Sequence, residues 1–240
     1  MSLVNLLNSN ITIQQSFRAW EDWNTLTFQK RVDLISKWKS YLLQQQDVPE
    51  QWINFIEFHH QYASMLIGEA ERMPGPTGES NILSTSGRGP FVIMAEDNTP
   101  LEAFISILTC TLIAGNSVIV VESGRFNVFM DAIYRTLAEF NIDPSLIQTI
   151  LKSEIEAVIS NSVIAGMAYI GTDNEAHRFN RMMAEREGQI AQLIIETNMT
   201  TLPIIHDPYL ILRFITEKTE TINLTAVGGN ANLLALGAGD

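Results

Sequence analysis

The chain has few cysteines and few basic residues, and both shortages exclude classes of protein. Cys110 is the single cysteine among 240 residues, so no disulfide can form within the chain. A reducing compartment, the cytoplasm, is therefore expected. The 15 lysines and arginines are outnumbered by 27 aspartates and glutamates, which gives a formal net charge of −12. Nucleic acids and anionic membrane surfaces attract clustered positive charge, so we expect neither as a partner.

Long apolar runs and metal-binding patterns are also missing. No stretch is long enough to cross a bilayer, and the N-terminus lacks the basic and apolar regions of a signal peptide. We therefore expect no direct membrane insertion. The 4 histidines show no ligand spacing with cysteines or carboxylates, so no metal site is expected. Hydrophobic residues make up 46% of the chain, which is ample for a folded core.

Residues 1–72 have the periodicity of amphipathic helices. From Phe28 to Leu42, apolar residues recur every three or four positions. The charged residues between them are expected to face solvent: Lys30, Arg31, Asp33, Lys37 and Lys39. A second such run begins at Pro49, a residue suited to the first turn of a helix. Two prolines and two glycines between 73 and 78 then end the helical segment.

Short apolar runs alternate with helical patterns from Gly89 onward. Four runs have the character of strands buried on both faces: 91–95, 117–121, 163–170 and 190–195. We expect a weaker strand at 146–151, and helices at 100–114, 126–140, 152–160 and 174–187. This alternation predicts an α/β fold with a doubly wound parallel sheet of Rossmann type. We divide the chain into a helical segment (1–72), a Rossmann-like domain (73–217), and a terminal strand with an apolar tail (218–240).

The reactive side chains form no recognisable catalytic set. Cys110 lies in the middle of an apolar helical pattern, where a thiol is usually a small core residue and not a reactive thiolate. His59 and His60 are adjacent on a predicted helix and so point in different directions, which indicates surface or partly buried packing. No catalytic residue is therefore predicted.

The loop after the predicted strand at 163–170 is the strongest candidate for nucleotide binding. Gly171 and Thr172 precede a predicted helix, and backbone N–H groups there can bind a phosphate beyond the end of a parallel strand. A glycine and a capping residue are equally what any strand-to-helix turn needs. Neither Gly-x-Gly-x-x-Gly nor a Walker A lysine motif is present. Both interpretations stay open, and structural capping is favoured over a cofactor-binding role.

The C-terminal tail is apolar along almost its whole length. Residues 226–239 carry no charged side chain, and the step from Gly228 to Asn230 permits a tight reversal before the leucines. A free end is normally polar, because apolar side chains gain nothing there. The alternative is a loose end that happens to be apolar. We predict instead a docking element, formed by Thr225, Gly228, Gly229, Asn230, Asn232, Leu233 and Leu234.

Residues 89–197 resemble the dinucleotide-binding half of the aldehyde dehydrogenase superfamily. The matching segments are Arg88–Ile93, Pro100–Leu101, Ile113–Val121, Val163–Thr172 and Leu193–Thr197. Two further segments, Met73–Asn81 and Thr225–Leu234, are similar to the C-terminal region of the proline utilization A (PutA) family. PutA proteins are bifunctional bacterial enzymes that oxidise proline to glutamate.

The chain departs from the catalytic members of the superfamily at two points. Asn198 and Met199 follow Glu196 and Thr197, where catalytic members have a glycine pair. The catalytic half, with its nucleophilic cysteine in a Gly-Gln-x-Cys setting, is absent. The resemblance therefore implies the non-catalytic C-terminal domain of long PutA proteins. That domain covers the dehydrogenase active site and helps to seal the tunnel through which the semialdehyde intermediate passes.

The same resemblance implies cofactors and partners. No cofactor is expected for this chain, whereas the parent enzyme combines proline dehydrogenase with 1-pyrroline-5-carboxylate dehydrogenase, uses FAD and NAD, and is compatible with membrane association. The expected partner is the aldehyde dehydrogenase domain of the parent chain or of a dimer mate, and a homodimer is compatible with the sequence. We also expect the chain to be part of a longer polypeptide. The alternative is a stand-alone regulatory protein that binds NAD or a related nucleotide through Gly171 and Thr172.

Overall fold

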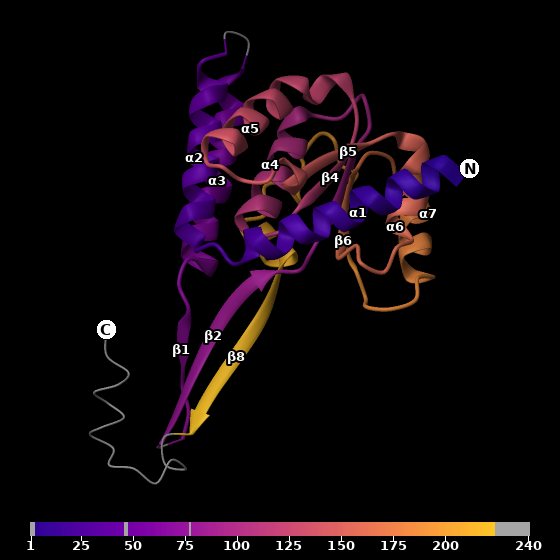
Figure 1. Cartoon of the computed structure of the whole chain (residues 1–240). Coiled ribbons are helices and arrows are strands. Elements are labelled where there is room, and N and C mark those ends of the chain that lie inside the picture. Colours follow the sequence, from indigo (N-terminus) through magenta and orange to yellow (C-terminus); the bar gives the residue numbers. More distant parts are fainter. Residues whose placement is uncertain (1–2, 46–47, 77, 224–240) are drawn as a thin grey trace.

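The structure is a computed structural model that describes residues 3–45, 48–76 and 78–223. It begins with three helices, as the sequence predicts: α1 (Leu3–Asn24), α2 (Phe28–Leu43) and α3 (Glu50–Ile67). The Thr27 hydroxyl accepts a hydrogen bond from the Lys30 N–H and so caps the start of α2. Figure 1 shows α2 and α3 packed side by side, while α1 runs separately across the body of the molecule.

Two expectations about these helices are wrong. Arg31 does not face solvent but is buried, and its guanidinium donates hydrogen bonds to the carbonyls of Ile113 (2.9 Å) and Leu26 (2.6 Å). Burial lowers the pKa of Arg31 to about 10. His59 is also fully buried, on α3. Periodicity places a residue on a helix face, but a second element can cover that face. The end of α4 (Leu101–Ile113) meets Arg31, and the segment of Ile205 and His206 lies against His59.

The centre of the fold is a five-stranded parallel sheet. Its strands are ordered β5-β4-β3-β6-β7, so the chain starts in the middle, moves to one edge, and then returns to fill the other side. This is the doubly wound arrangement that the sequence predicts. The strands are β3 (Phe91–Ala95), β4 (Val118–Val121), β5 (Ile147–Ile150), β6 (Gly166–Ile170) and β7 (Gln192–Glu196).

Alternate residues of β3 enter two separate apolar cores, one on each face of the sheet. Phe91 and Ile93 pack with α2, α3, α4 and α5 (Asn127–Glu139), whereas Val92 and Met94 pack with α6 (Ile155–Ile159) and α7 (Asp173–Ala184). Because α4 lies between the sheet and the α2–α3 pair, every residue from Ala103 to Ile113 is buried. Short 3-10 turns connect the elements: η1 (Gly124–Phe126), η2 (Pro144–Leu146), η3 (Lys152–Glu154) and η4 (Leu210–Phe214).

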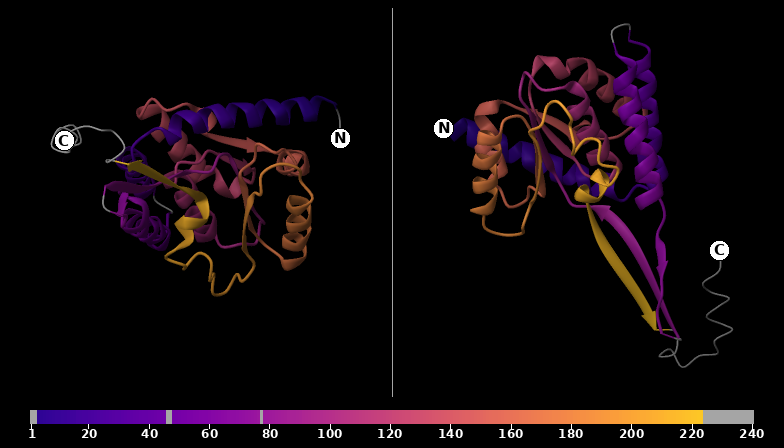
Figure 2. Two further views of the ribbon diagram at one scale, coloured as in Figure 1. Left: turned by 90° about the horizontal axis from the view of Figure 1, so that it is seen from below. Right: turned by 180° about the vertical axis from the view of Figure 1, so that it is seen from behind.

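A second, three-stranded antiparallel sheet projects from this body, and we call it the arm (Figures 1 and 2). Its strands, in the order β1-β2-β8, are β1 (Glu71–Met73), β2 (Glu79–Gly87) and β8 (Ile215–Asn223). The terminal strand therefore begins three residues before the predicted boundary at 218, and β2 was not predicted. The predicted tail and its docking residues, from Thr225 to Leu234, lie outside the described residues.

Two asparagines hold the root of the arm against the body. The Asn24 side chain accepts a hydrogen bond from the Gly87 N–H (2.8 Å). Asn116 Oδ1 accepts from the N–H groups of Arg88 (2.6 Å) and Gly89 (3.1 Å), while its Nδ2 donates to the carbonyls of Thr111 (3.2 Å) and Phe214 (2.8 Å). Asn116 therefore joins the end of β2, the turn after α4 and the start of β8 at one buried point.

Candidate functional site

The carboxyl edge of the parallel sheet is the place where folds of this kind bind nucleotides. The crevice lies between β3 and β6, because the chain leaves these neighbouring strands toward opposite sides of the sheet. Three parts of the chain meet there: Glu96 directly after β3, Tyr169 near the end of β6, and the loop of Gly171 and Thr172 that leads into α7. The predicted nucleotide loop thus lies where a phosphate would be expected.

In this structure the polar groups at the crevice are hydrogen-bonded to one another. The Tyr169 hydroxyl donates a hydrogen bond to Glu96 Oε1 (2.5 Å) and accepts one from the Thr172 N–H (3.0 Å). Desolvation, together with the hydrogen bond to Glu96, raises the pKa of Tyr169 to about 12. The hydroxyl thus stays protonated at neutral pH. The N–H group that would serve a phosphate is already bonded, and a carboxylate lies next to it.

The packing of Tyr169 also explains why a glycine is present at position 171. A Cβ atom at position 171 would lie 2.3 Å from the Tyr169 hydroxyl oxygen, well inside van der Waals contact. The Gly171 N–H donates to the carbonyl of Glu196 (3.1 Å), the last residue of β7. Gly171 therefore has a sufficient structural reason, the close approach of Tyr169, and the cofactor-binding role of Gly171 and Thr172 stays a prediction.

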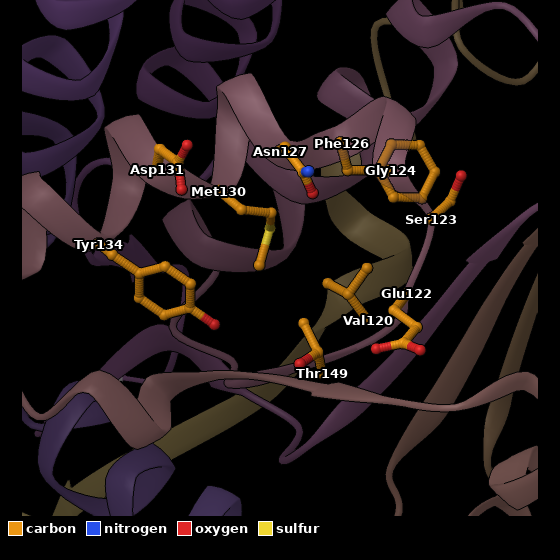
Figure 3. Close-up of a pocket in the computed structure, with 10 residues that line it drawn as sticks. All are labelled: Val120, Glu122, Ser123, Gly124, Phe126, Asn127, Met130, Asp131, Tyr134 and Thr149. Carbon is orange, nitrogen blue, oxygen red and sulfur yellow. The ribbon is translucent and has the colours of Figure 1, made fainter.

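Beside the crevice, a hollow of about 430 Å³ opens between the end of β4 and α5. Figure 3 shows Asp131, Met130 and Asn127 of α5 facing Thr149 and Glu122 at the strand ends. The lining contains two carboxylates and no lysine or arginine. Arg125 follows Glu122 closely, but its guanidinium is bonded to the backbone carbonyls of Glu96 and Thr99. A phosphate or diphosphate would be repelled from this hollow.

Glu196, which with Thr197 precedes the position of the glycine pair in catalytic members of the superfamily, has both carboxylate oxygens engaged. It is 2% exposed. One oxygen accepts the N–H of Asn198 (3.0 Å) and the other accepts the N–H of Ile204 (2.9 Å). The carboxylate thus shapes the loop after β7, and that geometry leaves no oxygen directed at a substrate.

Cys110 lies in the apolar core, as predicted. Its side chain is fully buried in α4, and burial raises the pKa of the thiol well above its usual value. A neutral thiol without solvent access is a poor nucleophile. Within residues 3–45, 48–76 and 78–223, no group of three or more His, Cys, Asp or Glu side chains could hold a metal ion. The same part of the chain contains no helix long and apolar enough to cross a membrane.

Sequence reasoning missed Glu96 and Tyr169, although both carry a recognisable signal. Each is a polar group at the carboxyl end of an apolar strand, which is where a doubly wound sheet places its functional side chains. What the sequence does not show is that the two strands are neighbours in the sheet, because 73 residues separate Glu96 from Tyr169. Topology therefore decides the pairing.

Comparison with known proteins shows which known folds this structure resembles. The sequence matches no described protein family and no curated protein sequence. Its structure is similar to a PutA mutant from Bradyrhizobium japonicum, with 26% identity over 80% of this chain and a TM-score of 0.70. It is also similar to PutA from Bdellovibrio bacteriovorus, with 16% identity over 80% of this chain and a TM-score of 0.70. The chain spans 22% of the length of these PutA chains.

An indole-3-acetaldehyde dehydrogenase has the same fold. It is 14% identical over 80% of this chain and 51% of that chain, with a TM-score of 0.67. The parallel sheet with its helices is thus an aldehyde-dehydrogenase-like fold, and 80% of this chain is similar to a part of PutA.

Proposed function

From this PutA-like fold we propose that the chain is a non-catalytic docking module of proline catabolism. It binds an NAD-dependent semialdehyde dehydrogenase unit, in the same polypeptide or in a dimer mate, and helps to cover that unit's active site and the channel for its intermediate. The observation that carries the proposal is the arm, which projects from the body and ends at Asn223, where the apolar tail begins.

The exposure of the arm favours docking. In β8 only the first residue is buried, and Ile82 of β2 and Ile222 of β8 are 38% and 45% exposed. Ile82 lies opposite Glu220, and Ile222 opposite Ser80, so the two isoleucines share one face. Within the described residues β8 pairs with β2 alone. A narrow sheet with both faces in water is marginally stable by itself, and a partner surface would stabilise it.

The environments of Cys110 and Glu196 favour a module that has no catalytic activity of its own. Thiol-dependent oxidation of an aldehyde by NAD needs an accessible thiolate to add to the carbonyl, and a free base close to it. Cys110 is buried and neutral, and both oxygens of Glu196 are bonded to the backbone. The described residues thus offer no such pair, and the dehydrogenase chemistry would come from the partner.

We expect no turnover when the chain alone is given glutamate semialdehyde and NAD. In the complete PutA-type system, deleting residues 226–240 should lower coupled conversion of proline to glutamate by about tenfold, because two or three buried leucines supply a few kcal/mol at an interface. Proline oxidation itself should be unchanged. Steady-state NADH production and a dye-coupled proline assay measure the two activities.

A variant of the arm tests the same interface without touching the tail. The double substitution Ile82→Lys with Ile222→Lys should weaken binding to the dehydrogenase unit, whereas Leu43→Lys, at an exposed leucine of α2, should not. Equal coupled rates in all variants would rule out the docking role. Turnover by the isolated chain that survives Cys110→Ala but depends on Glu196 would rule out the non-catalytic role.

The second candidate is a regulator that binds NAD, favoured by the position of Gly171 and Thr172 at the sheet crevice. Isothermal titration should show no saturable heat with NAD, NADH or ADP up to about millimolar concentration, because Tyr169 occupies the Thr172 N–H and Glu96 adds negative charge. Tyr169→Phe frees that N–H and serves as the comparison. Saturable binding of NAD by the unaltered chain would favour the regulator.

A further inference from the structure

A second hollow, of about 520 Å³, lies at the opposite edge of the sheet from the nucleotide crevice. It is formed where the chain enters three parallel strands: Arg88 precedes β3, residues 162–165 precede β6, and residues 188–191 precede β7. Thr216, at the root of the arm, completes it on one side. The hollow is therefore separate from the carboxyl edge described above.

One wall of the hollow is aromatic. Phe17 and Trp20 of α1 both line it, with ring centroids 5.2 Å apart and planes at 51°. Neither side chain is fully buried, so both present ring surface to the space. Aliphatic side chains from the strand entrances, Val163 and Ile190, add further apolar surface. Such a lining accepts a flat or branched apolar group.

The charge of the hollow is opposite to that of the chain. Arg88 lines it, and no aspartate or glutamate does, although the chain has a formal net charge of −12. Arg88 donates through one guanidinium nitrogen to the carbonyl of Ile215 (2.8 Å), which fixes its position, and no carboxylate of the described residues forms an ion pair with it.

A second cation lies behind the lining. Arg186 donates to the carbonyls of Ile159 (3.1 Å) and Ile164 (2.9 Å), so its charge is held against the segment that enters β6. It has no carboxylate partner among the described residues either. One guanidinium group thus lines the hollow and a second lies next to the segment of Ile164, and both attract an anion while keeping their bonds to the backbone.

We propose that this hollow binds a small organic carboxylate whose body is aromatic or branched aliphatic. The carboxylate pairs with the free side of the Arg88 guanidinium, and the apolar body lies against Phe17 and Trp20. An amine or a zwitterion fits less well, because the lining offers no carboxylate to an ammonium group. The ligand would touch α1, the sheet and the root of the arm at the same time.

Phenylacetate is a suitable probe, and phenylacetamide is its neutral counterpart of the same shape. Titration of the full chain, followed by the NMR signal of the Trp20 indole N–H (assigned with Trp20→Phe), should show saturable binding of phenylacetate and at least about tenfold weaker binding of phenylacetamide. Arg88→Gln should abolish that preference. Arg18→Gln removes the same charge from an exposed position next to Phe17 and should leave it unchanged.

A second pair of variants keeps the test independent of any effect of Arg88 on folding. Ser162 is an exposed lining residue, so Ser162→Glu adds a negative charge and Ser162→Gln adds similar volume without charge. Only the glutamate variant should weaken phenylacetate binding. No saturable shift of Trp20, or equal loss in both variants of a pair, would overturn the proposal. Neither result bears on the docking function, which does not use this hollow.

Discussion

Substitution of Asn116 by aspartate is expected to lower the free energy of unfolding by about 3–5 kcal/mol. Asn116 is 0% exposed, and its amide uses two donors and two acceptor positions. Aspartate has nearly the same shape and still accepts from Arg88 and Gly89. It cannot donate to the carbonyls of Thr111 and Phe214, however, and would place a buried negative charge against both of them.

Urea unfolding followed by circular dichroism measures this loss, and hydrogen exchange locates it. Exchange of the amides of Gly89 and Ile215 should become faster, because Asn116 holds both sides of the arm root. Asn174→Asp is the matched control: Asn174 is exposed in the first turn of α7, where a negative charge is tolerated, so its effect should stay within about 0.5 kcal/mol. A loss below about 1 kcal/mol for Asn116→Asp would show that the arm root does not depend on this side chain.

The centre of the parallel sheet could be predicted because β3, β4 and β6 are buried at every residue. These strands read as nearly uninterrupted apolar runs, and the run Phe91–Ala95 coincides with β3 residue for residue. The arm gives no such signal. The polar run of β2, from Glu79 to Gly87, buries only its last residue, so neither face carries the apolar alternation by which a strand is recognised. Its existence follows from pairing with β8, which lies more than 120 residues away.

The position of the candidate nucleotide site could be predicted from the sequence, but the side-chain contacts within it could not. The topology of a doubly wound sheet places Gly171 and Thr172 at the crevice, and the sequence alone indicated this. That Tyr169 and Glu96 are hydrogen-bonded to each other at the crevice depends on side-chain packing between two strands. Arg31 is a similar case, since helical periodicity assigns it to solvent while Ile113 at the end of α4 and Leu26 before α2 supply its carbonyl partners. Sequence periodicity predicts where helices and strands lie. The hydrogen-bond partners of a polar side chain depend on contacts between elements that are distant in the sequence.

Acidification should destabilise the protein through His59, by roughly 3 kcal/mol in total. His59 is 1% exposed, and its Nε2 has no hydrogen-bond partner in the structure. Burial lowers its pKa from 6.5 to about 4. A hydrogen bond with the backbone of Ile205 raises the pKa to a smaller extent, as does Asp207, and nearby His206 lowers it further. The folded state therefore keeps His59 neutral at a pH where the unfolded chain already binds a proton. Stability from this group is complete above pH 6.5 and falls as the pH decreases toward 4.

Chemical unfolding at pH 7 and pH 5 tests this, because the chain should lose about 2 kcal/mol more over that interval than a variant without the buried imidazole. His59→Leu has a similar volume and removes the titrating group, so its free energy of unfolding should depend less on pH by that amount. Carboxylates also titrate near the lower end of this range, but they are the same in both proteins, and the difference between the two curves isolates His59. His177→Leu, at an exposed position of α7, checks that loss of any histidine does not flatten the curve. Parallel plots of unfolding free energy against pH for His59→Leu and the unaltered chain would contradict this prediction. They would mean that α3 and the segment around Ile205 separate readily enough to hydrate the imidazole. The packing of α3 on the body would then be weaker than its burial indicates.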